Sequence, residues 1–370
     1  MAAAHRHLRS ASAVLGGAVV LAVAPAAPAS AHEKYFLRDG YATDWSFFFS
    51  PITLTLVLAV VIAAVAWRLV GRQLGPVELK PLARLGRLAP YVPRLLAIHL
   101  GVSLLALAVL GQFLAPSIEL HHLPARTLLG VLEGALGVWF ISGINIRPAT
   151  VVLAVVGPVS LFAIGPVGLL ESMNILGVAA FLYVVPPSAT GRYGAVTPAR
   201  EQLRTALLAL RVLVGGALIV LAFSEKLANP GLARAIIAQH SQLNVLGAIG
   251  INNVDLFIRM AGATEILFGL LVISGAMPQI AVLVAAIPFN LTLLLFGTTE
   301  LIGHLPVYGV FLALLVYGSS ARSAADVAYL PSPLWSSRWL SRRPPRRSAP
   351  PAAAVPVDLA AASRAAESVL

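Results

Sequence analysis

The chain has 370 residues, of which 58% are hydrophobic and only 11% are charged. A soluble globular domain carries charge on about a quarter of its residues, so this composition excludes an ordinary soluble protein. The absence of cysteine also excludes disulfides, thiolate metal sites and thiol redox chemistry. The formal charge of +11 lies mainly in loops that a membrane topology would place in the cytoplasm, so we interpret it as an orientation signal and expect no nucleic-acid partner.

The first 31 residues have the pattern of a secretory signal peptide. Basic residues in the stretch HRHLRS precede the apolar run AVLGGAVVLAVA, and a small-residue motif, ASA, ends at Ala31. An apolar run of about a dozen residues is too short to span a membrane but suits a cleaved signal. We therefore expect cleavage after Ala31 and a mature chain that begins at His32 on the extracytoplasmic side.

Apolar segments of membrane-spanning length recur along the rest of the chain, and we count about nine. The first lies near 51–70 and leads into a basic loop. The other eight lie near 93–115, 127–144, 148–166, 167–186, 206–224, 256–275, 278–297 and 301–318. Lys and Arg concentrate in alternate loops, which predicts an extracytoplasmic mature N-terminus and a cytoplasmic C-terminus. The predicted fold is therefore an all-α, multi-pass helical bundle in the lipid bilayer of the cell membrane.

An internal repeat indicates how this bundle is organised. Gly130–Gly143 aligns with Gly262–Gly275 at a constant offset of 132 residues, and six of the aligned positions are identical. Each copy belongs to a group of four predicted spans. An even number of spans gives both groups the same orientation, so we expect two parallel four-helix repeats and one additional N-terminal span.

The repeat divides the chain into six predicted segments. They are the signal peptide (1–31), the extracytoplasmic N-terminus with the first span and its basic loop (32–90), a first four-helix unit (91–187), a cytoplasmic linker (188–205), a second four-helix unit (206–320) and a basic cytoplasmic tail expected to be disordered (321–370). The first unit lacks several polar residues of the second, so we expect it to be a degenerate copy retained for packing.

Carboxylates occur at matching places in the two predicted units. Glu133 and Glu265 occupy the same aligned position in the second helix of each unit, and Glu171 and Glu300 lie at the outer end of each fourth helix. A carboxylate within hydrocarbon is energetically costly, so such residues usually face the bundle interior and are paired or protonated. The second unit adds further polar residues: Arg211, Glu225, Lys226, Arg259, Asn290 and His304.

These residues predict a polar chamber in the second unit that opens to the extracytoplasmic side. Glu265, Arg211 and Asn290 would form a ligand, proton or quinone site within it, and the other polar residues would surround its mouth. In the structural alternative, Glu265 pairs with Arg211 or hydrogen-bonds Asn290 and only holds the helices together, as buried polar groups do in membrane bundles. The sequence leaves both interpretations open.

Haem and metal sites have less support in the sequence. A haem between membrane helices needs two facing histidines, and His99 is the only histidine well inside a predicted span. A copper-type site is harder to dismiss than haem, and in it the terminal amine and imidazole of His32 would chelate a metal together. Either His121 and His122 or His304 would complete that site.

The second unit resembles the DoxX/DoxD-like family of membrane proteins. The resemblance rests on the stretches LLALRVLVGGALIVLAFSEKLANP, FIRMAGATEILFGLLVISG and GHLPVYGVFLALLVYG. The matching pattern is an Arg in the first helix (Arg211), a Lys at its outer end (Lys226) and a Glu-x-x-x-Gly in the second helix (Glu265 and Gly269). It covers about 206–318 directly, and about 93–186 only through the internal repeat, where the Arg and Lys are missing.

The resemblance implies a compact four-helix membrane module. DoxD relatives are subunits of thiosulfate:quinone oxidoreductase, and other DoxX-like proteins anchor oxidoreductase assemblies that handle sulfur or oxidative stress. We therefore expect the membrane subunit of a quinone-linked redox complex, with a soluble redox enzyme as partner and quinone as the candidate cofactor. The alternatives are a transporter or carrier for a small anion or metal ion, and a non-catalytic membrane scaffold.

Overall fold

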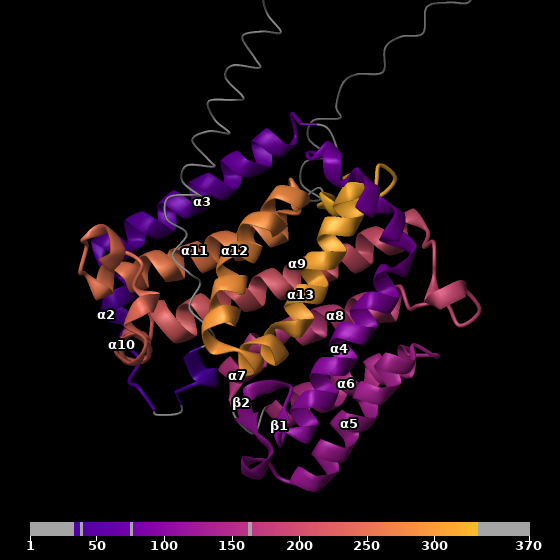
Figure 1. Cartoon of the computed structure of the whole chain (residues 1–370), viewed down its shortest axis with the longest axis horizontal. Helices are drawn as coiled ribbons and strands as arrows, with labels where there is room; N and C mark the ends of the chain where they lie inside the picture. The colour runs from indigo at the N-terminus through magenta and orange to yellow at the C-terminus, as the bar shows by residue number, and fades with distance from the viewer. Residues whose placement is uncertain (1–32, 38–39, 75–76, 162–164, 332–370) are drawn as a thin grey trace, which may run out of the picture. The chain divides into compact units, whose positions relative to one another are not determined.

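The computed structural model describes residues 33–331, apart from 38–39, 75–76 and 162–164. The predicted signal peptide, His32 and the predicted tail beyond residue 331 lie outside the described residues. Within them the chain is helical except for loops and one short two-stranded hairpin (Figure 1).

The elements fall into an N-terminal part and two halves, which we call the first half (residues 92–184) and the second half (residues 200–319). The N-terminal part contains η1 (Glu33–Tyr35), α2 (Trp45–Phe48), α3 (Pro51–Gly71) and η2 (Lys80–Tyr91). The first half contains α4 (Val92–Val109), β1 (Gln112–Phe113), β2 (Ala115–Glu119), η3 (Leu120–His122), α5 (Arg126–Ser142), α6 (Arg147–Leu161), α7 (Pro166–Glu171) and α8 (Met173–Val184). The second half contains α9 (Arg200–Leu221), η6 (Ala222–Leu227), α10 (Pro230–Gln239), α11 (Val254–Ser274), α12 (Pro278–Phe296) and α13 (Thr298–Ser319), and α14 (Ala324–Val327) follows it.

Six helices within the described residues are long and apolar enough to cross a membrane, which indicates a multi-pass membrane protein. They are α3, η2 with α4, α9 with η6, α11, α12 and α13. The other three predicted spans form shorter helices: α5 has 17 residues, α6 has 15, and Ser172 separates α7 from α8. The predicted count of nine spans is therefore not confirmed, because an uninterrupted apolar sequence does not guarantee an uninterrupted helix.

Local sequence explains where several of these helices start and stop. Ser50 caps α3 by accepting a hydrogen bond from the Thr53 N–H, and Pro51 follows at the first helical position. Helices α5 and α11 both end in Ser-Gly, and Gly143 and Gly275 adopt left-handed φ angles of 71° and 60°. Glycine reaches this conformation without a Cβ clash, so the shared dipeptide ends both helices in the same way.

The first two long helices of each half cross at a pair of glycines. A Cβ added to Gly101 of α4 would lie 2.6 Å from the carbonyl oxygen of Gly137 in α5. A Cβ added to Gly215 of α9 would lie 2.5 Å from the carbonyl oxygen of Gly269 in α11. Such close backbone approach is typical of helix packing in membranes, where small residues replace hydrophobic burial as the basis of association.

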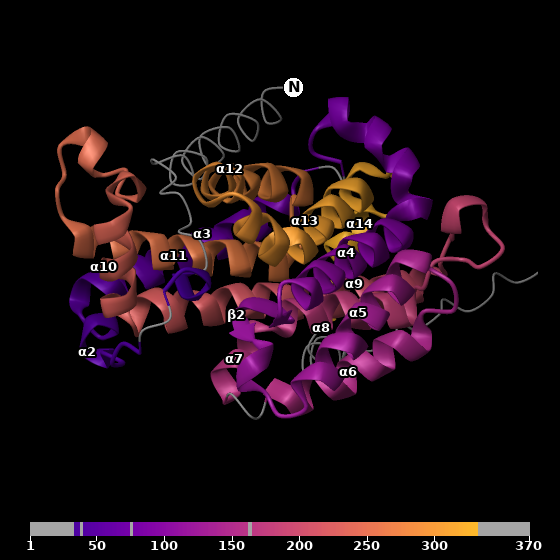
Figure 2. The same ribbon diagram turned by 60° about the horizontal axis from the view of Figure 1, so that its bottom comes forward.

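The last helix of each half packs against the first long helix of the other half. Helix α8 lies along α9, and α13 lies along α4 (Figures 1 and 2). Gly177 of α8 faces Leu213 of α9, and Gly309 of α13 faces His99 of α4. The two halves therefore share one continuous apolar core, in which neither half is complete without the other.

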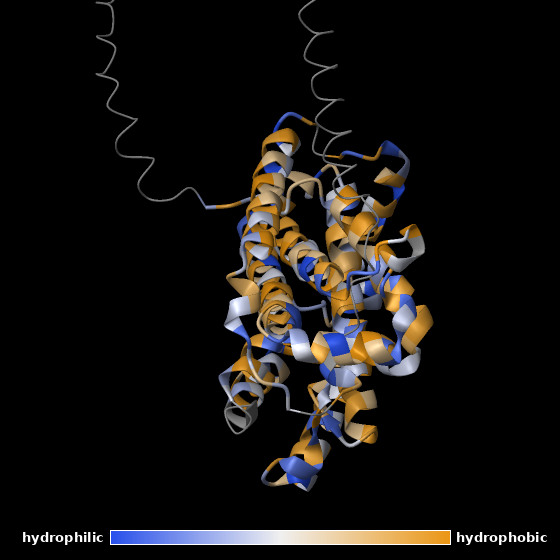
Figure 3. Cartoon of the chain, turned by 90° about the vertical axis from the view of Figure 1, so that its left-hand side faces the viewer, coloured by the Kyte–Doolittle hydropathy of each residue, from blue (hydrophilic) through white to orange (hydrophobic). Residues whose placement is uncertain are grey.

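Helix α3 and the first residues after α13 pack onto the second half. Helix α3 lies against α11, yet its outer face exposes Leu54, Leu58 and Ile62. Orange, the colour of hydrophobic residues, recurs along the helices of the bundle (Figure 3). At the other edge, α14 packs on α9 and α13, and its buried Asp326 forms an ion pair with Arg204 at 2.7 Å. The predicted boundary at residue 321 is therefore too early, because the folded part continues to about Leu330.

Two variants in α5 test the close contact between α4 and α5 at the crossing glycines. Gly137→Ala should destabilise the fold by roughly 1–3 kcal/mol, since the new methyl group meets the α4 backbone. Gly134→Ala, one turn earlier, is the control, because its Cβ would lie 3.7 Å from the Ala108 Cβ, an ordinary contact. Thermal unfolding in detergent should give a lower midpoint for Gly137→Ala only. Equal midpoints would show that the two helices are not held at this distance.

Candidate functional site

Buried polar side chains gather at two opposite ends of the helical bundle. Helices α4 and α9 stop at the end next to β1 and β2, which we call the hairpin end. They begin at the opposite end, which we call the arginine end. The hairpin end contains the carboxylates and lysines of the candidate site. The arginine end contains guanidinium groups that cap helix C-termini.

At the hairpin end, α9 changes from an α-helix into a turn of π-helix, η6, before the chain leaves the bundle. Glu225 and Lys226 lie in this turn, and each has only 1% of its side chain exposed. The Lys226 Nζ lies 2.9 Å from the Glu265 Oε1 of α11 and 3.9 Å from the Glu225 Oε2. Isolated π-turns often occur at functional sites, and this one buries two adjacent charged residues.

A second carboxylate group lies where the two halves meet. Glu171, at the end of α7, accepts a hydrogen bond from the Ser224 Oγ at 2.5 Å and forms an ion pair with Lys34. Glu171 and Glu225 both line a cavity of about 40 Å³, together with Tyr35 and Gly303. Its size admits a few water molecules, whereas drug-sized ligands occupy pockets of roughly 300–1,000 Å³. The cavity that these described residues line is therefore much smaller than the open chamber that the sequence predicts.

Tyr35 connects this cavity to a third polar pair. In α13 the His304 Nδ1 lies 3.2 Å from the Glu300 Oε1, and both side chains are almost fully buried. The rings of Tyr35 and His304 have centroids 6.1 Å apart. Burial, followed by the charges of Glu225, Glu300 and Glu171, raises the pKa of Tyr35 well above its ordinary value, so this phenol stays protonated at neutral pH.

In the first half, the repeat equivalent of Glu265 has a different partner. Glu133 is 1% exposed, and its Oε1 accepts a hydrogen bond from the backbone N–H of Leu114 at 2.7 Å. Leu114 lies in the turn between β1 and β2, so a backbone amide of the hairpin contacts Glu133 where an ammonium group contacts Glu265. Glu133 thus accepts a hydrogen bond from a backbone amide, whereas Glu265 forms an ion pair.

Arg211 does not pair with Glu265, contrary to one of the alternatives drawn from the sequence. Its guanidinium lies at the arginine end and donates hydrogen bonds to the carbonyl oxygens of Leu207, Ile273 and Tyr329. It therefore satisfies carbonyl groups at the end of α11 and fixes the segment after α14. The sequence placed Arg211 correctly on α9 but could not show toward which end its long side chain points.

Asn290 and Arg259 also lie outside the buried cluster. Asn290 is exposed on α12 and donates to the Ala286 carbonyl oxygen of its own helix. The Arg259 guanidinium lies 3.8 Å from the centre of the Phe47 ring, and its Nε donates to the Thr53 Oγ1 at 3.1 Å. Arg259 therefore joins α11 to α2 and α3. The prediction that Asn290 shares a site with Glu265 is wrong, because the helical period turns it to the outer face of α12.

The structure adds residues that the sequence did not single out. Lys34, Tyr35 and Ser224 all contribute to the cluster, and the first two come from the short segment after the predicted cleavage site. Lys34 and Tyr35 in the stretch HEKYF (32–36) were the only sequence features that hinted at a role for this segment. Nothing in the sequence placed the segment against α7 and α13. His121 and His122 lie exposed in η3 beside Glu119, whereas His304 is buried beside Glu300.

Comparison with known proteins gives no relative for this chain. No family model, no curated protein and no solved structure matches it.

Proposed function

We propose that this chain is a DoxX-like membrane subunit of a quinone-linked redox complex, and that its buried cluster at the hairpin end exchanges protons during the redox reaction. The observation that carries the proposal is the set of four buried or nearly buried carboxyl groups, Glu171, Glu225, Glu265 and Glu300, close to Lys34, Lys226 and His304. Ionisable residues in membrane helices are energetically costly and usually mark ion pathways, substrate sites or proton relays.

The proximity of ionisable groups in the cluster supports proton exchange over a purely structural role. A structural pair needs one carboxylate and one cation, as Lys226 and Glu265 already provide. Among the described residues, Glu171 also lies beside Lys34, and Glu300 lies beside His304. Ionisable groups this close influence one another's protonation, so the cluster would hold a proton or a cation and release it when the local charge changes.

Buried apolar residues toward the arginine end support a site that is accessible only from the hairpin end. Toward the arginine end the first long helices present fully buried apolar residues, among them Leu96, Leu100, Leu210 and Val214. A transporter must open its site to both sides of the membrane in turn. A redox subunit needs exchange with one side only, which the pattern of basic loops predicts to be the extracytoplasmic side.

The repeated glycine crossings support descent of the two halves from one duplicated four-helix unit. Gly137 and Gly269 share the offset of 132 residues, as do Gly177 and Gly309. Under this proposal the functional ion pair, Lys226 and Glu265, lies in the second half. The first half keeps Glu133 for packing.

The quinone itself would bind beside the cluster, because the 40 Å³ cavity is too small for a quinone ring. Glu265 has 10% of its side chain exposed and is therefore the member of the ion pair that a bound ligand reaches most easily. When bound, the quinone would accept electrons and protons. The chain's own residues would hold and deliver the protons.

The first experiment is purification of the native protein in a mild detergent, with mass spectrometry of co-purifying proteins and extracted lipids. We expect a stoichiometric redox enzyme and bound quinone. A lone protein without quinone would contradict the proposed function. In that case accumulation of an anion or metal ion in sealed vesicles would support a transporter, and its absence would support a scaffold.

The repeat supplies a matched pair of substitutions for activity. Glu265→Gln should lower quinone-dependent turnover roughly 100-fold or more, the range for loss of a proton-transfer group. Glu133→Gln should leave turnover unchanged, because the amide oxygen can still accept the Leu114 N–H. Equal loss in both variants would assign both carboxylates to packing.

The ion pair also predicts non-additive stability. Lys226→Met should destabilise the fold by about 3–5 kcal/mol, because it leaves Glu225 and Glu265 buried beside each other without the cation. The double variant Lys226→Met with Glu265→Gln should regain much of that loss. Thermal unfolding in detergent measures both. Strictly additive effects would mean that Lys226 and Glu265 do not interact.

A further inference from the structure

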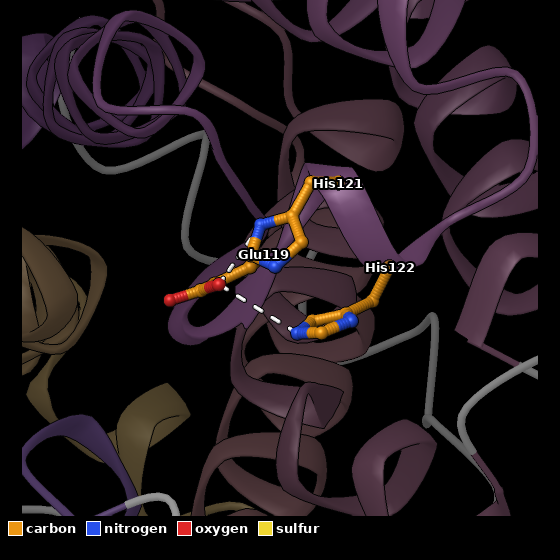
Figure 4. Close-up of side chains that lie close together, drawn as sticks. All are labelled: Glu119, His121 and His122. Carbon is orange, nitrogen blue, oxygen red and sulfur yellow. Dashed lines mark ion pairs between the residues drawn. The ribbon is translucent and has the colours of Figure 1, made fainter.

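The β1–β2 hairpin carries a set of potential metal ligands that is separate from the buried cluster. Glu119 ends β2, and His121 and His122 follow in η3. One carboxylate oxygen, the Glu119 Oε2, lies 2.9 Å from the His121 Nδ1 and 3.7 Å from the His122 Nε2. Figure 4 shows both imidazoles turned toward this carboxylate. The hairpin therefore gathers two nitrogen donors and one oxygen donor from four consecutive residues.

The spacing of these donor atoms fits a metal ion. All three lie within 4.8 Å of one another. Zinc bonds of about 2.0–2.2 Å in tetrahedral geometry place ligand atoms roughly 3.4 Å apart. The observed separations of 2.9 and 3.7 Å lie on either side of that value. Small side-chain rotations would therefore bring all three atoms to bonding distance, without backbone movement.

The two imidazole rings are themselves unusually close. Their centroids are 3.9 Å apart at an interplanar angle of 42°. Both side chains are more than half exposed, so burial does not force the rings together. Both rings contact the same carboxylate oxygen of Glu119, an arrangement that a cation shared by the three side chains would stabilise.

A hollow beside the hairpin provides room for a further ligand of the metal. It has a volume of about 460 Å³ and is lined by Glu119 and His121, with Gln112, Arg126 and Thr127 close by. Gln112 pairs with Glu119 across the hairpin, and its buried Oε1 has no hydrogen-bond partner among the described residues. A buried amide oxygen is expected to accept a hydrogen bond, and water bound to a metal ion would donate one here.

We propose that Glu119, His121 and His122 bind a divalent transition-metal ion of the zinc class, with the remaining coordination position facing the hollow. Two imidazoles and a carboxylate suit Zn²⁺ and Cu²⁺, whereas Mg²⁺ and Ca²⁺ prefer oxygen ligands alone. The nearby positive charge of Arg126 favours an anion, such as hydroxide or a carboxylate, at the open position. The site needs neither His32 nor His304, so it differs from the copper-type site expected from the sequence.

The test is titration of the purified, metal-stripped protein with Zn²⁺ against a chromophoric chelator. We expect one site per chain, and at least about 100-fold weaker binding in the double variant His121→Ala with His122→Ala, which removes two ligands. Glu119→Gln should also weaken binding. Two control variants, His240→Ala and His32→Ala, should leave the affinity unchanged. X-ray absorption of the zinc-loaded protein should show two imidazole nitrogens and at least one oxygen near 2.0 Å.

Two results would overturn the proposal. One is unchanged affinity in the double histidine variant, and the other is weak binding that His240→Ala reduces equally, which would indicate adventitious surface binding only. A loss of binding in His32→Ala alone would instead place the metal at the mature N-terminus. None of these outcomes bears on the quinone-linked function, because the hairpin ligands do not belong to the buried cluster.

Discussion

The close backbone contact between the first two long helices of each half determines much of the rest of the structure. Gly101 and Gly137 allow α4 and α5 to approach until no side chain fits between them, and Gly215 and Gly269 do the same for α9 and α11. Helices in lipid gain little from hydrophobic burial, so this contact must rely on dispersion and close fit. It also fixes where each carboxylate points, because Glu133 and Glu265 lie one helical turn from their crossing glycine.

The packing of the last helix of each half, α8 or α13, against the other half then creates the interior of the hairpin end. Because α8 packs on α9 and α13 packs on α4, residues from both halves meet around one small cavity. Glu171 from the first half, Glu225 from the second half and Tyr35 from the N-terminal segment all line it. Charged groups that would each be costly in hydrocarbon thereby become neighbours.

The two halves accommodate the aligned carboxylates, Glu133 and Glu265, in two different ways. Glu133 accepts a backbone N–H in a loop that bends back through the left-handed residue Leu114, with φ of 60°. Glu265 faces an ammonium group carried by a π-turn. A hydrogen-bonded carboxyl group needs no counter-ion if it is protonated, whereas an ion pair responds to every change in nearby charge. This contrast explains why we assign function to the second half.

The sequence by itself determined the class of protein and the positions that carry charge. Its low charge content and long apolar runs indicated a helical membrane protein, and the aligned Glu133 and Glu265 marked two buried positions. Only the tertiary structure decided the partners. Arg211 turned toward the arginine end, Asn290 turned outward, and Lys226 became the partner of Glu265. Depth along a helix can be read from residue number, whereas the direction of a long side chain and the helix that it meets depend on packing between segments distant in the chain.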